Sequence, residues 1–81
     1  MRAAFIRQTG DPDVIIVDTL PDPVPGPRDV LVAVKACAVN PIDTYVRAGT
    51  VAMPLAVPFV VGCDLAGEVV AVGSEVDRFR P

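Results

Sequence analysis

Histidine is absent from the 81 residues, and tyrosine occurs once. Without histidine, this stretch of chain has no histidine general base, no Ser-His relay and no histidine metal ligand. The two cysteines, Cys37 and Cys63, form neither a CxxC pair nor a metal-knuckle spacing. Both are therefore predicted to be thiols in a reducing cytosol.

An excess of positive charge and a long apolar run are also lacking. Seven basic and ten acidic residues give a net charge of -3, and the basic residues are scattered. A nucleic-acid partner is therefore not expected. The longest apolar candidate, 51–61, is too short to cross a membrane and contains Pro54 and Pro58. The first residues are charged too early for a signal peptide, so the default setting is cytoplasmic.

Apolar residues, in contrast, are abundant, at 52% of the chain. That fraction is high for so short a chain, because a small domain leaves much of its surface uncovered. We expect part of this apolar surface to be covered by chain that the sequence does not contain. After Gly73, a new apolar pattern starts at Val76 and Phe79 and is cut off at Pro81. Residues 1–81 are thus predicted to be one incomplete domain.

The pattern predicts a mainly β fold with a short helix. Strands are expected over 3–7 and 14–20, joined by a turn at 10–13, and again over 29–39 and 65–72. The third strand is continuously apolar, which favours a strand covered on both faces with Cys37 in the core. Gly67 marks a bulge or a close backbone approach in the last strand. A bent sheet or partial barrel is the predicted architecture.

The segment 21–27 holds four prolines, which remove backbone donors and keep the chain extended. We interpret it as a stiff connector between strands. The alternative is a proline-rich ligand for a recognition domain, which its position between two strands of one sheet disfavours.

A short helix is predicted to start at Asn40. Asn40 suits the N-cap, Pro41 the first helical position and Asp43 the first turn, while Gly49 supplies a C-terminal stop. Ile42, Tyr45 and Val46 are expected to share one face of this helix, and Asp43 and Arg47 to pair along another.

Five segments follow one another along nearly the whole chain, at 1–4, 22–27, 29–32, 40–49 and 58–73. Together they resemble the start of the medium-chain dehydrogenase/reductases, in the zinc-independent quinone oxidoreductase branch. Each motif is modest alone, but their order and spacing are specific.

The resemblance implies an incomplete GroES-like β-barrel, followed in the family by a Rossmann domain with the active site in the cleft between them. No GxGxxG and no β-α-β unit occur in this sequence, so the main cofactor site is expected to lie in the absent downstream domain. The implied activity is hydride transfer from NADPH, without zinc, to a small-molecule quinone or another α,β-unsaturated carbonyl. The 81-residue piece alone is expected to be inactive, and the full-length protein to be a homodimer without nucleic-acid or membrane partners.

Asn40 and Tyr45 are the candidate catalytic and cofactor-binding residues. Asn40 matches the position where the zinc-dependent branch places a cysteine ligand, so its amide is expected to contact the nicotinamide or the substrate. A plain helix cap is the alternative, and one side chain can serve both roles. Tyr45 resembles the family tyrosine near the nicotinamide and substrate, and its hydroxyl could orient a carbonyl. The alternative for Tyr45 is packing beside Ile42 and Val46.

Cys63 and Asp64 are weaker candidates for the substrate cleft. Cys63 matches the position of a histidine ligand in the zinc branch, but one thiolate with Asn40 is a poor zinc set, so no metal site is predicted. A small buried inert thiol is the preferred interpretation of Cys63. Asp64 could cap a strand end or orient cleft residues. Two other functions stay open: a zinc-type alcohol dehydrogenase relative, and a non-enzymatic GroES-like module for binding or assembly.

Overall fold

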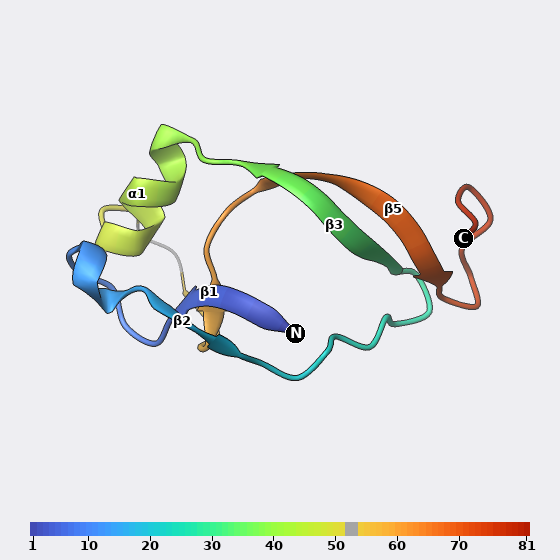
Figure 1. The fold of residues 1–81 in the computed structure, drawn as a ribbon, viewed down its shortest axis with the longest axis horizontal. Coiled ribbons are helices and arrows are strands. Elements are labelled where there is room, and N and C mark those ends of the chain that lie inside the picture. Colours follow the sequence, from blue (N-terminus) through green and yellow to red (C-terminus); the bar gives the residue numbers. More distant parts are fainter. Residues whose placement is uncertain (52–53) are drawn as a thin grey trace. The chain divides into compact units, whose positions relative to one another are not determined.

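The computed structural model describes residues 1–51 and 54–81. These residues form two compact units, each made of two separate stretches of chain. The first unit comprises Met1–Pro21 and Ala38–Cys63, and the second comprises Asp22–Cys37 and Asp64–Pro81. The structure is mainly β with one short α-helix, as predicted (Figure 1).

The first unit is built around a three-stranded antiparallel sheet. Its strands are β1 (Arg2–Ile6), β2 (Ile16–Thr19) and β4 (Phe59–Val60), in the order β2-β1-β4. Phe5 in the central strand lies opposite Ile16 on one side and Val60 on the other. The predicted hairpin of the first two strands is confirmed, and a 3-10 turn, η1 (Pro12–Val14), lies in the connection between them. The sequence did not predict β4, which is only two residues long and directly follows Pro58.

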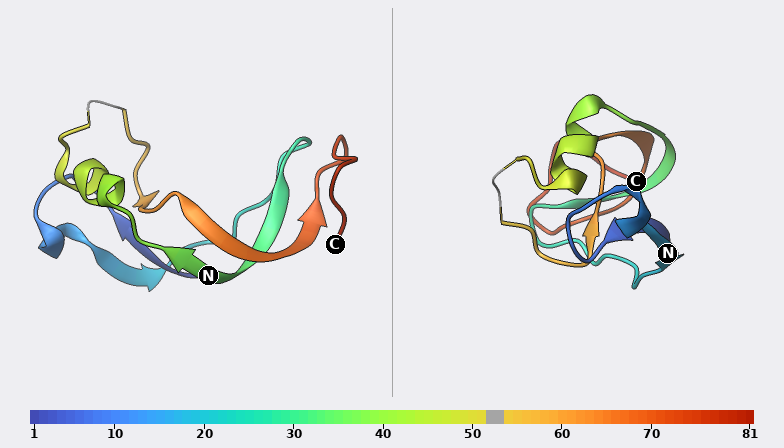
Figure 2. Two further views of the ribbon diagram at one scale, coloured as in Figure 1. Left: turned by 90° about the horizontal axis from the view of Figure 1, so that it is seen from above. Right: turned by 90° about the vertical axis from the view of Figure 1, so that its left-hand side faces the viewer.

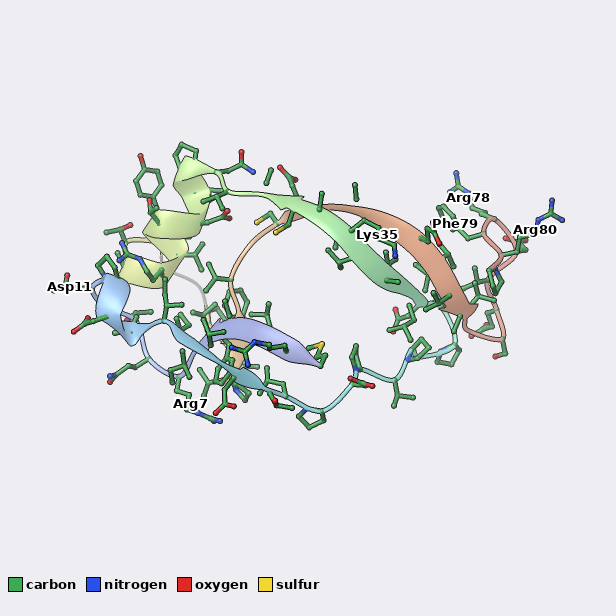
Figure 3. All side chains as sticks on the ribbon, viewed as in Figure 1. Arg7, Asp11, Lys35, Arg78, Phe79 and Arg80 are labelled. Carbon is green, nitrogen blue, oxygen red and sulfur yellow. The ribbon has the colours of Figure 1, made fainter. Side chains whose placement is uncertain are left out.

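Helix α1 (Pro41–Ala48) packs in the first unit. Its Val46 is 9% exposed, and β1 contributes Phe5 at 2% and Ile6 at 0%; these are the buried apolar side chains among the described residues. Arg7, labelled in Figure 3, places its guanidinium 5.3 Å from the centre of the Phe5 ring. The core that holds α1 in place is therefore small and consists mainly of two residues of the central strand and one residue of the helix.

The second unit contains two long strands, β3 (Val30–Ala38) and β5 (Asp64–Val72), paired in a sheet of their own. Figures 1 and 2 show the two strands side by side and running in opposite directions. Beyond the strand ends, Gly73 N–H donates to Asp29 O at 2.8 Å and Glu75 N–H donates to Pro27 O at 2.8 Å. The segment before β3 has no regular secondary structure, in agreement with the proline-rich connector.

Gly67 explains how closely β5 approaches β3. A Cβ built at this position would collide with the carbonyl oxygen of Ala33 and lie 2.8 Å from a methyl of Val32. No side chain fits there, so glycine is required by the neighbouring backbone. The predicted close approach at Gly67 is confirmed.

The prediction that the third strand is covered on both faces is wrong for the described structure. Residues 30–33 of β3 are half-buried, and residues 34–38 are exposed, including Lys35 (Figure 3). Cys37 is likewise exposed and is not a core residue. The physical reason is that β3 pairs with one strand only, and a two-stranded sheet leaves most of its two faces open. The described strands belong to two sheets and close no barrel.

Across the part of the chain that the structure describes, no helix is both long enough and apolar enough to span a membrane.

Candidate functional site

The N-terminus of α1 positions the first candidate residue, Asn40. Asn40 is the N-cap, with extended backbone angles of φ -118° and ψ 157°, and Pro41 is the first helical residue. The backbone N–H of Asn40 donates to Oδ2 of Asp43 at 2.9 Å, and the N–H of Asp43 donates to the carbonyl oxygen of Asn40 at 3.0 Å. The predicted helix start is confirmed, and Asp43 holds it as the third helical residue of a capping box.

Asp43 is the buried charged side chain of the described structure, at 6% exposure. Its Oδ1 atom is buried and has no hydrogen-bond partner among the described residues. A helix cap contributes about 1 kcal/mol, whereas leaving a buried polar atom unpaired costs about 1–3 kcal/mol. The two effects are of the same size, so helix stability alone does not account for a carboxylate at this place.

The buried side of α1 is not the side that the apolar pattern indicated. Asp43 and Val46, three residues apart, point into the first unit, whereas Ile42 is 48% exposed and Tyr45 is 54% exposed. Ile42, Tyr45 and Val46 have the spacing of one helical face, as predicted, but only Val46 of the three is buried. The helix is rotated by about one residue, or 100°, from the apolar pattern, so that a carboxylate lies inward and the tyrosine lies outward.

Gly49 ends the helix as predicted. It adopts a left-handed conformation with φ 84°, and its N–H donates to the carbonyl oxygens of Tyr45 and Val46. The predicted ion pair between Asp43 and Arg47 is not formed in the described structure. Nη1 of Arg47 is buried without a hydrogen-bond partner there, and the main-chain oxygen of Arg47 accepts a 2.9 Å bond from Gly10 N–H.

Cys63 and Asp64 lie where the first unit passes into β5. Cys63 belongs to the first unit and Asp64, the first residue of β5, to the second. Both side chains are exposed, so the interpretation of Cys63 as a buried thiol is wrong. Free cysteine is usually a buried residue type, but few side chains of the described structure are buried.

The described residues contain no group of three or more histidine, cysteine, aspartate or glutamate side chains arranged to hold a metal ion. Two of the candidate residues belong to the same helix. Asn40 caps α1, and Tyr45 projects from its exposed side. An amide and a phenol can both donate and accept hydrogen bonds.

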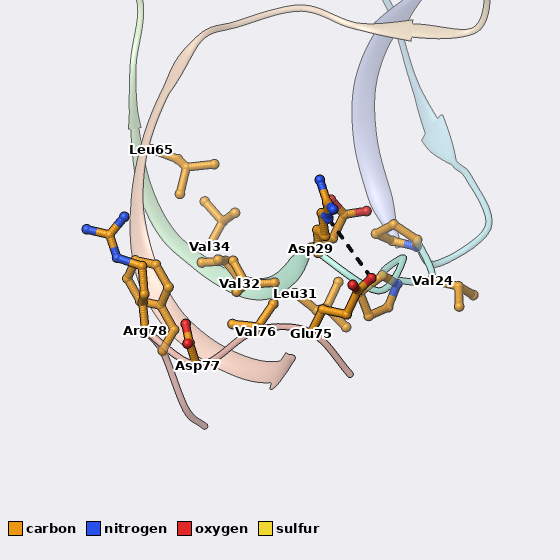
Figure 4. Close-up of a pocket in the computed structure, with 15 residues that line it drawn as sticks. Val24, Asp29, Leu31, Val32, Val34, Leu65, Glu75, Val76, Asp77 and Arg78 are labelled. Carbon is orange, nitrogen blue, oxygen red and sulfur yellow. Dashed lines mark ion pairs between the residues drawn. The ribbon is translucent and has the colours of Figure 1, made fainter. Parts of the chain in front are cut away.

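The second unit contains a groove that the sequence did not predict. Its volume is about 930 Å³. Its apolar part is lined by Leu31, Val32, Val34, Leu65, Val76 and Phe79. Charged residues stand beside it, and Arg28 Nε lies 4.0 Å from Glu75 Oε2 (Figure 4). The continuous apolar run of the third strand carries no period-2 signal that would have indicated this groove.

A smaller pocket of about 360 Å³ lies in the first unit, beside Val46 and Gly49. Gln8 and Thr9 are its polar residues. None of Asn40, Tyr45, Cys63 and Asp64 lines either of these two pockets.

The family model "Alcohol dehydrogenase GroES-like domain" matches residues 26–81. The chain belongs to this family. Over 81 residues it is 40% identical to quinone oxidoreductase from Lama guanicoe, covering 99% of this chain and 24% of that protein. The predicted kinship with the quinone oxidoreductase branch of the medium-chain dehydrogenase/reductases is confirmed.

Solved structures of the superfamily share this fold. The quinone oxidoreductase of Escherichia coli complexed with NADPH superposes with a TM-score of 0.89 at 30% identity, over 99% of this chain and 24% of that one. An NAD-dependent alcohol dehydrogenase superposes with a TM-score of 0.90 at 46% identity, over 100% of this chain and 24% of that one. The chain spans about a quarter of the length of these relatives. The chain therefore has the fold of the N-terminal GroES-like part of the superfamily.

Proposed function

We propose that the protein to which this chain belongs transfers a hydride from NADPH to a quinone or another α,β-unsaturated carbonyl, without zinc. Residues 1–81 would be the incomplete GroES-like domain of that enzyme, with the main cofactor site further along the full-length chain. The observation that carries the proposal is the outward position of Tyr45, which is 54% exposed on the helix that begins at Asn40.

The exposure of Tyr45 argues against a purely packing role. A tyrosine that served as an amphipathic core residue would bury its ring and direct only its hydroxyl to water. Here Val46 is the buried residue of the helix, whereas Tyr45 and Ile42 are about half-exposed. The small buried side of α1 fixes the helix, and Tyr45 on its other side is accessible within the described residues.

The two site residues would act by hydrogen bonding. The phenolic O–H of Tyr45 donates to the acceptor carbonyl and stabilises the negative charge that develops on its oxygen during reduction. The amide of Asn40 has both a donor and an acceptor, which suits a carboxamide group or a second carbonyl. Both residues hold their partner in place, which lowers the entropic part of the barrier.

NADPH, when bound, supplies the hydride, two electrons with one hydrogen nucleus, and is oxidised, while the acceptor is reduced and takes up one proton. The side chains of Asn40 and Tyr45 suit an orienting role, because each offers a hydrogen-bond donor and an acceptor. The relatives that support this cofactor include the Escherichia coli quinone oxidoreductase complexed with NADPH.

The zinc-free part of the proposal rests on the ligand positions. Catalytic zinc takes three protein ligands from cysteine, histidine or carboxylate side chains. Asn40 offers an amide and Cys63 a single thiol at the two positions where the zinc branch has ligands. The 46% identity to an NAD-dependent alcohol dehydrogenase makes an alcohol substrate the second candidate.

The experiment is isotope transfer with the full-length protein. NADPH deuterated at C4 of the nicotinamide is mixed with an enone, and the product is analysed by mass spectrometry. One deuterium on the carbon skeleton of the reduced enone supports the proposal. Absence of turnover with quinones and enones, together with oxidation of simple alcohols by NAD, would replace it with the second candidate.

A further inference from the structure

We propose that Asp43 is a positioning residue, which sets the place of Asn40 and through it the rate of hydride transfer. The inference rests on the proposed function, because Asn40 has a reacting partner only if that function holds. Asp43 itself lies inward, on the opposite side of the helix from Tyr45.

Two hydrogen bonds join the main chain of Asn40 to Asp43. Oδ2 of Asp43 accepts the N–H of Asn40 at 2.9 Å, and the N–H of Asp43 reaches the oxygen of Asn40 at 3.0 Å. Because both main-chain groups of Asn40 are bonded to one residue, its backbone angles are fixed from the buried side of α1. The side chain of Asn40 then leaves the backbone in a defined direction.

The burial of Asp43 distinguishes it from an ordinary cap. A glutamine at this position of a capping box would hold the same N–H without taking a charge out of water. Asp43 is 6% exposed, and its second oxygen, Oδ1, has no partner among the described residues. A buried carboxylate held by one rigid bond gives a more exact position than a mobile surface side chain, since its own rotamer is locked by packing.

Thr44 provides a matched control in the same turn. Its hydroxyl donates to Pro41 O at 2.6 Å, and its side chain is exposed. This bond also stabilises the start of α1, but it does not involve Asn40. Thr44→Ala is therefore expected to lower the stability of the helix without displacing Asn40.

The test is a double-mutant cycle in the full-length protein, with kcat for NADPH and a naphthoquinone, the Kd of NADPH and the melting temperature as readouts. Asp43→Ala is expected to lower kcat about tenfold or more, since small displacements of a reacting group are costly. Asp43→Asn, which keeps an acceptor oxygen, should recover most of that loss. Thr44→Ala should leave kcat unchanged, and the Kd of NADPH should change little in all three variants.

The decisive comparison is the same substitution in an Asn40→Ala background. If Asp43 acts through Asn40, Asp43→Ala has little further effect on kcat there, although it lowers the melting temperature equally in both backgrounds. Multiplicative effects on kcat, or an Asp43→Asn variant as slow as Asp43→Ala, would overturn the inference. If Asp43→Ala does not fold, the Asn variant alone decides: a kcat reduced tenfold overturns it, and a nearly normal one supports it.

The two proposals can fail separately. If Asn40→Ala itself keeps the normal kcat, the role of Asn40 in the proposed function is wrong. If Asn40→Ala is slow but Asp43→Ala is as fast as the natural protein, the proposed function stands and the positioning role is wrong.

Discussion

The backbone N–H of Asn40 donates a 2.9 Å hydrogen bond to the buried carboxylate of Asp43, three residues further along the chain. This bond links the small core of the first unit to the candidate site, because Asp43 lies on the buried side of α1 and Asn40 at its start. On the opposite side of the same helix, the side chain of Tyr45 is exposed. The hydrogen bonding proposed for Asn40 and Tyr45 therefore depends on how the buried side of α1 packs.

Tyr45→Phe removes one hydroxyl and leaves the ring. If the hydroxyl holds the acceptor carbonyl, kcat of the full-length protein should fall about tenfold, as expected for one hydrogen bond to a developing charge, while the Kd of NADPH stays the same. Thr44→Val, which removes a hydroxyl from the same helix, is the control and should keep its kcat. Normal turnover in Tyr45→Phe would remove this tyrosine from the mechanism.

Ile6→Ala tests the core that holds α1. Ile6 is 0% exposed, so truncation should cost about 2–5 kcal/mol of local stability. Hydrogen-exchange mass spectrometry of β1 and α1 peptides in rising urea would show earlier loss of protection. The control, Val39→Ala, is 83% exposed and should change stability by no more than about 0.5 kcal/mol. Equal protection in both variants would contradict the described packing.

Gly67→Ala tests the pairing of β3 and β5. The added methyl would collide with Ala33 O, so the strands must separate, at a cost of about 1–3 kcal/mol. Faster amide exchange along both strands of the full-length protein is the expected result. Ala66→Ser, at the exposed neighbouring position, should leave exchange unchanged. If amide exchange in Gly67→Ala were as slow as in the unsubstituted protein, the close approach of the two strands would be absent in solution.

The sequence predicts those features that depend on a few neighbouring residues. Asn40, Pro41 and Gly49 mark the two ends of α1 correctly, because capping and left-handed stops are local effects. The close approach at Gly67 is predictable because a glycine weakens the interior of a strand, so its presence there indicates a bulge or a nearby backbone. The family is predictable because several modest motifs occur in one order.

The side of α1 that is buried could not be predicted. Ile42, Tyr45 and Val46 have helical spacing, but Asp43 and Val46 fit the same period when the helix is turned by one residue. Preference for apolar residues inside selected the wrong solution, because the structure buries a carboxylate to hold Asn40. The predicted burial of Cys37 and Cys63 is wrong for a related reason: residue type does not tell how much of the chain covers a side chain.

The account is tested most directly by the metal dependence of the full-length protein. Zinc would be measured by mass spectrometry in purified protein, and NADPH oxidation by a quinone would be followed before and after exhaustive chelation. The account predicts zinc far below one atom per chain and an unchanged kcat after chelation. One tightly held zinc per chain, with turnover that disappears on chelation and returns on adding zinc, would contradict it.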